Sequence, residues 1–339
     1  VLFAHDKQIA WQRYINFTIP FIALYFIFKE ELDYGKARLI LFALFFSGIA
    51  VSGIGILEFI FNKSVIYEQF IQNAFYEHYL TESRIMSTLT SPVIAGTYLM
   101  SCLPVSYYVI SVLKGKNRVF ALLGAAIITG GLILTFTRMS WLSALIAAVL
   151  YAIIKKVKLL QILIVACLIC AGLAMAIKAR PVLAHKIQYK QIISSFKEYR
   201  LKRYPATFRM VKDHPIAGVG LNNYRIVFDD YYGSRDERYE YKIPDNMYLM
   251  MLGESGIAGL GLFILFIFVM LKKAVRDLRN NKDSSYKDVR LVFILMLVGL
   301  FIHMASYELF YWTTPYFLFL FSIAGLLSME RYEKFSECA

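Results

Sequence analysis

Long apolar stretches alternate with short charged segments along most of the chain. A hydrocarbon core about 30 Å thick is crossed by roughly 20 apolar helical residues, whereas membrane β-strands alternate in segments of about ten. The pattern therefore predicts an all-α polytopic membrane protein. About nine transmembrane helices are expected, at residues 14–28, 39–62, 86–113, 119–136, 139–154, 159–177, 246–271, 291–308 and 312–329.

The composition supports this class. Of the 339 residues, 58% are hydrophobic, 16% are aromatic and only 18% are charged. The mean hydropathy is +0.54. A soluble domain does not need so apolar a composition to form its core, so the class of integral membrane proteins is favoured.

Basic residues in the short loops predict the orientation. Lysine and arginine collect in cytoplasmic loops, and here they are concentrated at 114–118, 155–158 and 272–290. With these loops inside, the segment 179–245 and the turn 306–312 lie outside. Residue 1 would then also lie outside without a signal peptide, so three further helices are expected upstream, about twelve in all.

The long outer segment divides the chain into three parts. Residues 1–178 are predicted to form N-terminal transmembrane helices, 179–245 one large, partly helical extracytoplasmic loop, and 246–339 the C-terminal helices and a short cytoplasmic tail. The loop is basic, which topology does not require. Either an anionic substrate or anionic lipid headgroups would explain its charge. Nucleic acid is not an expected partner for a loop on the outer face.

Two short motifs carry little chemical information. Gly218-Val219-Gly220 lacks the preceding strand and the lysine of a phosphate loop, so we interpret it as a tight turn. Cys167-Leu-Ile-Cys170 has zinc-like spacing without a second ligand pair, and it lies in an apolar stretch. No carboxylate cluster of the magnesium-binding type occurs either. Neither a metal nor a cofactor is expected.

Three segments in order resemble the O-antigen ligase and polysaccharide polymerase family: "TFTRMSWLSALIAAVLY", "RLKRYPATFRMVKDHPIAGVGLNNY" and "PDNMYLMMLGESGIAGLGLF". The resemblance covers roughly residues 40–330. In that family an outer loop begins with an arginine and leads to a His-Pro-x-x-Gly-x-Gly motif. The matching positions here are Arg200, Tyr204, Ala206, His214, Pro215, Gly218 and Gly220. The resemblance implies a GT-C-like fold in the bacterial cytoplasmic (inner) membrane, with the active site on the extracytoplasmic side.

The resemblance also implies a donor, an undecaprenyl-diphosphate-linked glycan. Because the diphosphate is already a leaving group, the reaction needs cations to stabilise it and a base for the acceptor hydroxyl. Arg138 and Arg200 are predicted for the first role and Asp245 for the second. One base and no covalent nucleophile predict inversion at the anomeric carbon. The expected substrate-binding residues are Arg84, Arg203, Arg209, His214, Tyr224 and Asn246.

The pair Asp245-Asn246 marks a departure, since the lipopolysaccharide ligases of the family have His-Asn at this place. Aspartate favours a polymerase that joins repeat units of a capsule or exopolysaccharide. The alternatives are a ligase that transfers to lipid A-core or another acceptor, and a flippase, which would need broken or charged helices near the bilayer centre. Expected partners are a glycan or lipid-linked acceptor, membrane lipid, and a chain-length regulator or flippase.

Other polar positions have structural interpretations. Asp245 is also a good N-cap for the helix that follows it. Glu254 is expected to pair with a buried arginine, His303 to face the bundle, and Glu308 to belong to an interfacial aromatic turn. A stripe of small residues suited to close helix packing is formed by Gly253, Gly256 and Gly259.

Overall fold

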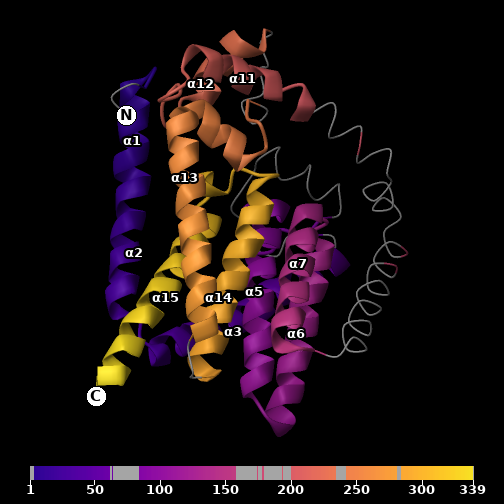
Figure 1. Cartoon of the computed structure of the whole chain (residues 1–339). Coiled ribbons are helices and arrows are strands. Elements are labelled where there is room, and N and C mark those ends of the chain that lie inside the picture. Colours follow the sequence, from indigo (N-terminus) through magenta and orange to yellow (C-terminus); the bar gives the residue numbers. More distant parts are fainter. Residues whose placement is uncertain are drawn as a thin grey trace.

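The computed structural model describes residues 4–61, 63, 84–157, 174, 178, 193, 200–233, 242–280 and 284–338. Within these segments every regular element is a helix (Figure 1). The principal helices are α1 (Lys7–Arg13), α2 (Ile19–Glu31), α3 (Tyr34–Phe61), α5 (Pro92–Val112), α6 (Gly115–Leu134), α7 (Arg138–Lys155), α11 (Tyr204–Asp213), α12 (Tyr224–Tyr232), α13 (Met247–Asn280), α14 (Ser284–Met304) and α15 (Thr313–Cys338). A π-helical turn, Tyr14–Thr18, joins α1 to α2, and a 3₁₀ turn, Leu309–Tyr311, precedes α15.

The apolar stretches predict the helices well. Among the described residues, five helices are long and apolar enough to cross a membrane, namely α3, α5, α6, α7 and α13, the last counted across a break at Gly256. The apolar part of α15, Thr313–Ser328, is shorter. A polytopic, all-helical membrane protein is therefore confirmed, while the number of nine spans stays a prediction. The expected span 159–177 except for residue 174, the segment 62–85 except for residues 63, 84 and 85, and most of 179–199 lie outside the described residues.

Helix α5 lies at the centre of the bundle, in contact with α3, α6, α7, α14 and α15. Of its apolar stretch 83% is buried, against 17% for α13, which therefore presents most of its surface to lipid. Ser91 caps α5 by accepting a hydrogen bond from Ile94 N at 3.2 Å. Pro92 follows in the first turn, where the missing N–H has no helical partner to lose.

The segment before α5 corrects one predicted boundary. The apolar stretch begins at residue 86, but α5 begins only at Pro92, and residues 84–91 are irregular. Glu58 of α3 satisfies their buried backbone, because its Oε2 accepts from Met86 N at 3.0 Å and from Ser87 N at 2.7 Å. Irregular backbone is tolerated inside a membrane bundle when protein groups supply its hydrogen bonds.

Helix α13 is broken near its start, at Gly256, where φ is 67° and ψ is −169°. The loop that follows α11 supplies the hydrogen bonds that the break removes. Its bonds to α13 are Val219 N to Gly253 O at 2.9 Å, Gly220 N to Glu254 O at 2.9 Å, and Ile257 N to Pro215 O at 2.9 Å. The Gly-Val-Gly sequence is thus a turn bound to α13.

This arrangement changes the interpretation of the glycine stripe. A Cβ atom at Gly256 would lie 2.2 Å from Ile216 O. The absence of a side chain at Gly256 therefore allows close approach of the loop after α11, and not of another transmembrane helix. A Cβ at Gly253 would lie 2.8 Å from the Tyr224 ring of α12, in keeping with close helix packing. A Cβ at Gly259 would contact only Ser255 of its own helix. The predicted role of the stripe in close helix packing is therefore correct for Gly253 and wrong for Gly256 and Gly259.

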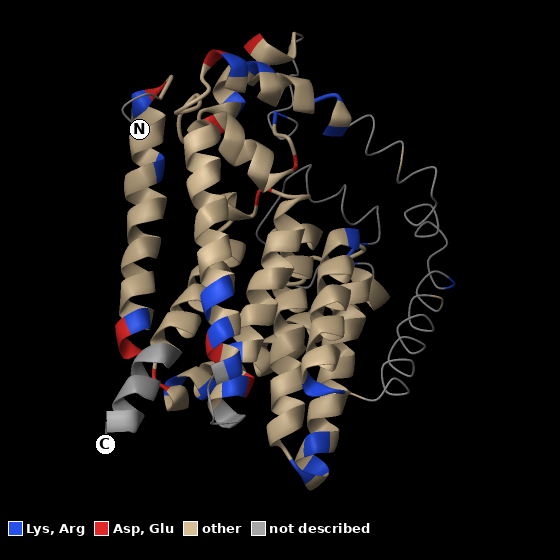
Figure 2. Ribbon diagram, in the orientation of Figure 1, with Lys and Arg blue, Asp and Glu red and all other residues tan. Residues whose placement is uncertain are grey.

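Helices α11 and α12 cover one end of the bundle, which we call the cap end (Figure 1). They share a small core with α13 that includes Met210, Phe228 and Met250. The N-terminal segment binds the same region, since His5 N donates to Val219 O at 2.9 Å. Lysines and arginines gather both at the cap end and at the opposite end of the bundle, and the middle is almost free of them (Figure 2).

Candidate functional site

Arginines from distant parts of the sequence meet at the cap end. Arg138 is the exposed first residue of α7, and its charge interacts with those of Arg84 and Arg200. Arg84 donates through Nε to Thr135 O at 3.0 Å, which fixes it beside the α6–α7 turn. Arg200 donates to Ser306 O at 3.0 Å, in the turn between α14 and α15. The structure thus brings three of the predicted residues together.

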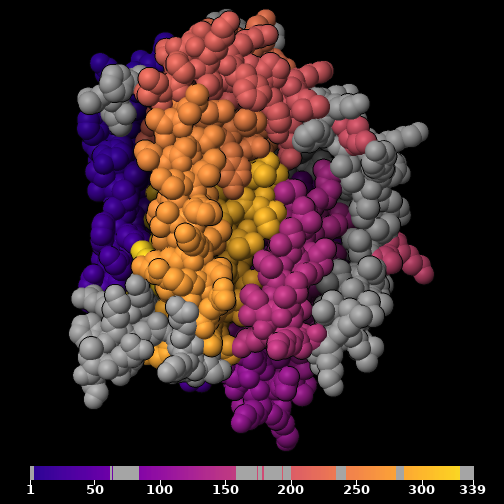
Figure 3. Space-filling model, in the orientation of Figure 1, coloured from indigo at the N-terminus to yellow at the C-terminus, as the bar shows by residue number. Residues whose placement is uncertain are grey.

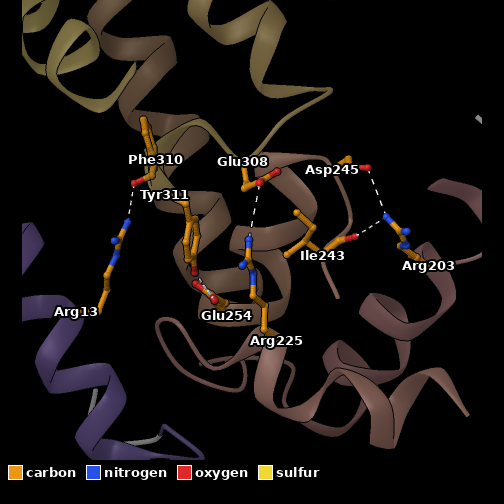
Figure 4. Close-up of polar contacts among 9 residues, drawn as sticks. All are labelled: Arg13, Arg203, Arg225, Ile243, Asp245, Glu254, Glu308, Phe310 and Tyr311. Atoms are coloured by element: carbon orange, nitrogen blue, oxygen red, sulfur yellow. Dashed lines mark hydrogen bonds and ion pairs between the residues drawn. The ribbon is translucent and has the colours of Figure 1, made fainter. Parts of the chain in front are cut away.

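Asp245 lies beside this group and is held by Arg203. Arg203 Nη1 is 3.5 Å from Asp245 Oδ2 and 3.5 Å from Ile243 O (Figure 4). Asp245 itself has φ +47°, in the left-handed region that non-glycine residues rarely adopt. Such backbone costs about 1–3 kcal/mol and is maintained only when its surroundings impose it. The chain after the cap is therefore forced to present this carboxylate to the arginines.

The surroundings of Asp245 set its acidity. Burial raises the pKa of its carboxyl above the ordinary value, and the positive charges of Arg200, Arg203 and Arg225 partly oppose that rise. The side chain is still 27% exposed, so a substrate hydroxyl can reach it. A partly buried carboxylate with a raised pKa, near cations, has the properties of a general base.

Asn246, not Asp245, caps α13. Its Oδ1 accepts from Tyr248 N at 2.9 Å and from Leu249 N at 3.1 Å. The alternative interpretation of Asp245 as the N-cap is therefore wrong, because the neighbouring amide performs that function. The substrate-binding role of Asn246 stays a prediction, and the cap leaves the Asp245 carboxylate available for other partners.

Two residues of the site were missed from the sequence, Arg225 of α12 and Glu308. Arg225 Nη2 is 3.9 Å from Glu308 Oε1, and the Glu308 side chain is only 1% exposed (Figure 4). Glu308 Oε2 is buried without a hydrogen-bond partner among the described residues. Burial raises the pKa of Glu308 to about 7, and the nearby charge of Asp245 adds to the rise.

Glu308 does belong to an aromatic turn, since it directly precedes the 3₁₀ turn Leu309–Tyr311, but its side chain is buried and the expected interfacial position is wrong. Tyr307 and Trp312 do stack, with ring centroids 6.1 Å apart, but Glu308 points into the protein beside Arg225. The cost of a charge in apolar sequence, which drew attention to Asp245, applied equally to Glu308. That signal could have identified it.

Three predicted substrate-binding residues lie away from this group. Arg209 is on the exposed side of α11 and donates to Tyr231 O at 2.8 Å. His214 is exposed at the C-terminal end of α11. Tyr224 is fully buried in the cap core, where its hydroxyl shares a 2.5 Å hydrogen bond with Thr207 Oγ1. The structure does not bring these three to Asp245.

Glu254 and His303 have structural surroundings. Glu254 accepts hydrogen bonds from the Tyr311 hydroxyl and from Tyr224 N (Figure 4). The expected arginine is Arg13, whose charge acts on Glu254 while its Nη2 donates to Phe310 O at 2.8 Å.

His303 faces the bundle, as expected. It is buried, and its Nε2 lies 2.8 Å from Ser140 Oγ of α7. Both Glu254 and His303 thus join helices around the site without facing the arginines directly.

The site carries a surplus of positive charge. We define the arginine cluster as Arg84, Arg138, Arg200, Arg203 and Arg225. The charges of Arg200, Arg203 and Arg225 act on Asp245, and Arg225 also pairs with Glu308. Arg138 adjoins the group through Arg200, and Arg84 adjoins it through Arg138. Guanidinium groups bind phosphate oxygens in pairs of parallel hydrogen bonds, so such a cluster suits a phosphate-bearing ligand. Within the described part of the chain, no group of three or more His, Cys, Asp or Glu residues is placed to hold a metal ion.

A bundle of membrane-crossing helices with a charged site under a helical cap defines the class: a polytopic helical membrane protein. A family model described as O-Antigen ligase matches residues 123–264. The chain therefore carries an O-antigen ligase domain, and the predicted membership of the O-antigen ligase and polysaccharide polymerase family is confirmed for this region. A search among curated proteins found no significant match. The matched region includes Arg138, Arg200 and Asp245, whereas Arg84 and Glu308 lie outside it.

Proposed function

We propose that the protein is a membrane glycosyltransferase that polymerises undecaprenyl-diphosphate-linked repeat units at the outer face of the bacterial cytoplasmic membrane. The observation that carries this proposal is the action of Arg200, Arg203 and Arg225 on Asp245, with Arg138 next to Arg200 and Arg84 next to Arg138. A lipid-linked donor is anionic at the bond that must break, so a site rich in arginine can both bind the donor and stabilise the leaving group. The O-antigen ligase domain supports an activity of this general kind.

In the proposed reaction an acceptor hydroxyl attacks the anomeric carbon of the donor sugar. The bond between that carbon and the diphosphate oxygen breaks, and the diphosphate leaves with the electron pair. Arg138 and Arg200 stabilise the charge that develops there, with Arg84 behind them. Asp245 accepts the hydroxyl proton, and Arg203 keeps its carboxylate in position. A single displacement of this type inverts the anomeric configuration.

Glu308 sets the charge balance behind Asp245. Two carboxylates that interact this closely do not ionise independently, so the more buried one keeps its proton to a higher pH. The pKa of Glu308, raised to about 7 by burial, fits that role. A neutral Glu308 leaves the charge of Asp245 and the arginines available to the substrate.

The polymerase proposal rests on Asp245, because the family's ligases have histidine there. A ligase that transfers lipid-linked polysaccharide to lipid A-core or another acceptor is the second candidate, since the family match covers both activities. The flippase alternative gains no support from that match. The break in α13 at Gly256 binds the cap loop, which offers a structural reason for it other than transport.

The experiment measures glycan length in cells that lack the protein. They are complemented with the full-length wild type or with Arg138→Ala, Arg200→Ala or Asp245→Asn, and membrane expression is measured for each. Lys212→Ala is the matched control, since Lys212 is an exposed cation on α11 away from Asp245. Under the proposal the three site variants stop polymer formation and the control does not.

The species that accumulates separates the candidates. Single repeat units on the carrier at the outer face support a polymerase. Full-length polymer that stays on the carrier indicates a ligase. Precursors trapped at the inner face would mean that the protein moves lipid-linked glycans across the membrane, and the proposed function would then be wrong.

A further inference from the structure

The loop after α11 ends in an apolar side chain that the cap does not cover. Ile216 is 74% exposed, the largest exposure among the exposed large hydrophobic residues described. The loop is not free to move away from α13, because Pro215 O accepts from Ile257 N at 2.9 Å. Ile257, directly after the break, is itself 60% exposed. The two isoleucines are therefore held at the same level of the molecule.

Below this level α13 presents a continuous apolar face. Leu262 is 69% exposed, Leu265 56% and Phe268 61%. Figure 3 shows the residues of α11 and α12 directly above this column of α13 atoms, with no gap between them. The lipid-facing surface of α13 thus continues without interruption onto the loop that carries Ile216.

The length of α13 explains why the loop is needed there. From Ile257 to Leu271 the helix offers 15 apolar or small residues before Lys272 and Lys273. At 1.5 Å per residue these span about 22 Å, which is less than the hydrocarbon thickness of about 30 Å. The preceding turns cannot supply the difference, because the break redirects them to the cap core, where Met250 is fully buried.

We propose that the tip of this loop, residues 215–217, is a membrane anchor whose partner is the phospholipid bilayer. Ile216 inserts among the lipid chains of the leaflet at the cap end and extends the apolar surface of α13. The loop that it anchors is the same one that binds Gly253 O and Glu254 O through Val219 and Gly220. Insertion therefore fixes the height of the cap, which carries Arg203 and Arg225, relative to the membrane.

Cysteine labelling in lipid nanodiscs tests this anchor. The full-length chain is prepared with its four cysteines replaced by serine, and then with Ile216→Cys, Asp230→Cys or Leu262→Cys. The nanodiscs contain phosphatidylethanolamine and phosphatidylglycerol, and the probe is a membrane-impermeant maleimide. Asp230 is exposed on α12 and serves as the water-facing control, while Leu262 is the lipid-facing control.

We expect Ile216→Cys to react at least tenfold more slowly than Asp230→Cys and at a rate close to that of Leu262→Cys, although Ile216 is 74% exposed in the protein itself. All three must react fully in sodium dodecyl sulfate, which shows that each thiol is intact. Equal rates for Ile216→Cys and Asp230→Cys would overturn the proposal. Nanodiscs loaded with one copy each contain no protein besides the scaffold belt at their rim, so slow labelling does not come from a partner protein.

A second measurement covers the case in which the cysteine variant does not fold. Ile216→Trp is reconstituted with phospholipids brominated on the acyl chains, and the emission of the wild type is subtracted. Blue-shifted emission that these lipids quench supports insertion. Red-shifted emission without quenching contradicts it. Both measurements report contact with lipid and not transfer of a glycan, so their outcome is independent of the proposed function.

Discussion

The middle of the bundle and its cap end are built in different ways. In the bundle, helices α3, α5, α6 and α7 are regular and pack through small residues. Gly131 of α6 approaches Ser52 of α3, and Gly96 of α5 approaches Ser140 of α7. Association in a membrane depends on such close packing, because lipid chains are as apolar as the side chains they replace. The stability of the bundle therefore comes from close contacts between neighbouring helices.

Most of the strained backbone lies at the cap end. Of the described non-glycine residues with positive φ, Ser87, Phe136, Asn222 and Asp245 lie in segments at this end, and only Lys156 lies elsewhere. The buried charged side chains Arg203, Glu254 and Glu308 lie in the same place, whereas Glu58 and Arg290 are buried within helices α3 and α14. Strained backbone and buried charge persist only when surrounding packing offsets their cost. The difference indicates that packing in the bundle stabilises the fold and offsets the cost of the strained backbone and buried charges at the cap end.

The largest expected effect is on activity, at the cap end alone. We expect Asp245→Asn to lower the rate of glycan transfer by about 10²–10⁴-fold, the usual contribution of a general base. In the wild type the rate should fall as the pH is lowered through the raised pKa of Asp245, because the protonated carboxyl cannot accept a proton. The measurement is a pH profile with purified protein and lipid-linked glycan extracted from the same cells.

An unchanged thermal unfolding midpoint in the Asp245→Asn variant would show that the loss is catalytic. Full activity in this variant would show that Asp245 is not the general base of the reaction.

The sequence predicts the bundle much better than the cap end. Apolar runs identify every described transmembrane helix because their signal is local, and one run of 20 residues is sufficient. The site depends on contacts between distant residues, such as Arg200 with Ser306 and Arg225 with Glu308. The family resemblance selected Arg138 and Arg200 in advance, whereas both the resemblance and the cost of a charge in apolar sequence pointed to Asp245. Glu308 carries the same signal of a charge in apolar sequence, but only the fold shows that it pairs with Arg225.

The break in α13 joins the two regions, and a single methyl group should disrupt it. Gly256 has φ 67° and ψ −169°, a region open essentially to glycine alone, and a Cβ there would lie 2.2 Å from Ile216 O. We expect Gly256→Ala to lower stability by more than about 3 kcal/mol, since backbone strain adds to a clash with backbone. Thermal unfolding in detergent micelles measures this.

Gly261→Ala is the matched control, because Gly261 lies on the same helix and a Cβ there would have no neighbouring atom within 4 Å. This variant should be as stable as the wild type or slightly more so, since alanine favours the helix by up to about 1 kcal/mol. Equal effects of the two substitutions would mean that the loop does not depend on the break.

The buried carboxylate Glu308 should make stability depend on pH. Its pKa is raised to about 7 in the folded protein from an ordinary value of 4.5. Folding therefore favours its protonated form, so the contribution to stability is present below pH 4.5 and is lost as the pH rises through 7. The full loss is about 3 kcal/mol. The unfolding midpoint should fall between pH 5 and pH 8, and Glu308→Gln should flatten that fall.

The comparison of wild type and Glu308→Gln tests the interacting pair of Glu308 and Asp245, because removing one carboxyl also changes the titration of the other. Parallel midpoints for the two proteins across the pH range would contradict a raised pKa for Glu308. The same variant should keep Arg225 in place through its amide oxygen, so a collapse of the cap would also be visible as increased proteolysis between α11 and α12.

The smallest expected effect tests the bundle itself, through two adjacent glycines of α6. A Cβ at Gly131 would lie 2.5 Å from Ser52 Oγ and 3.0 Å from Ser52 Cα, and the second contact involves backbone that no side-chain rotation relieves. A Cβ at Gly130 would lie 3.9 Å from Ile56 Cδ1, an ordinary contact. We therefore expect Gly131→Ala to destabilise the protein by about 1–3 kcal/mol and Gly130→Ala to be neutral or mildly stabilising.

Thermal unfolding of both variants, with glycan transfer measured below the midpoint, tests this expectation. If Gly131→Ala lowers stability and leaves transfer intact, the bundle acts as support alone, whereas a loss of transfer without a loss of stability would show that its packing also positions the site.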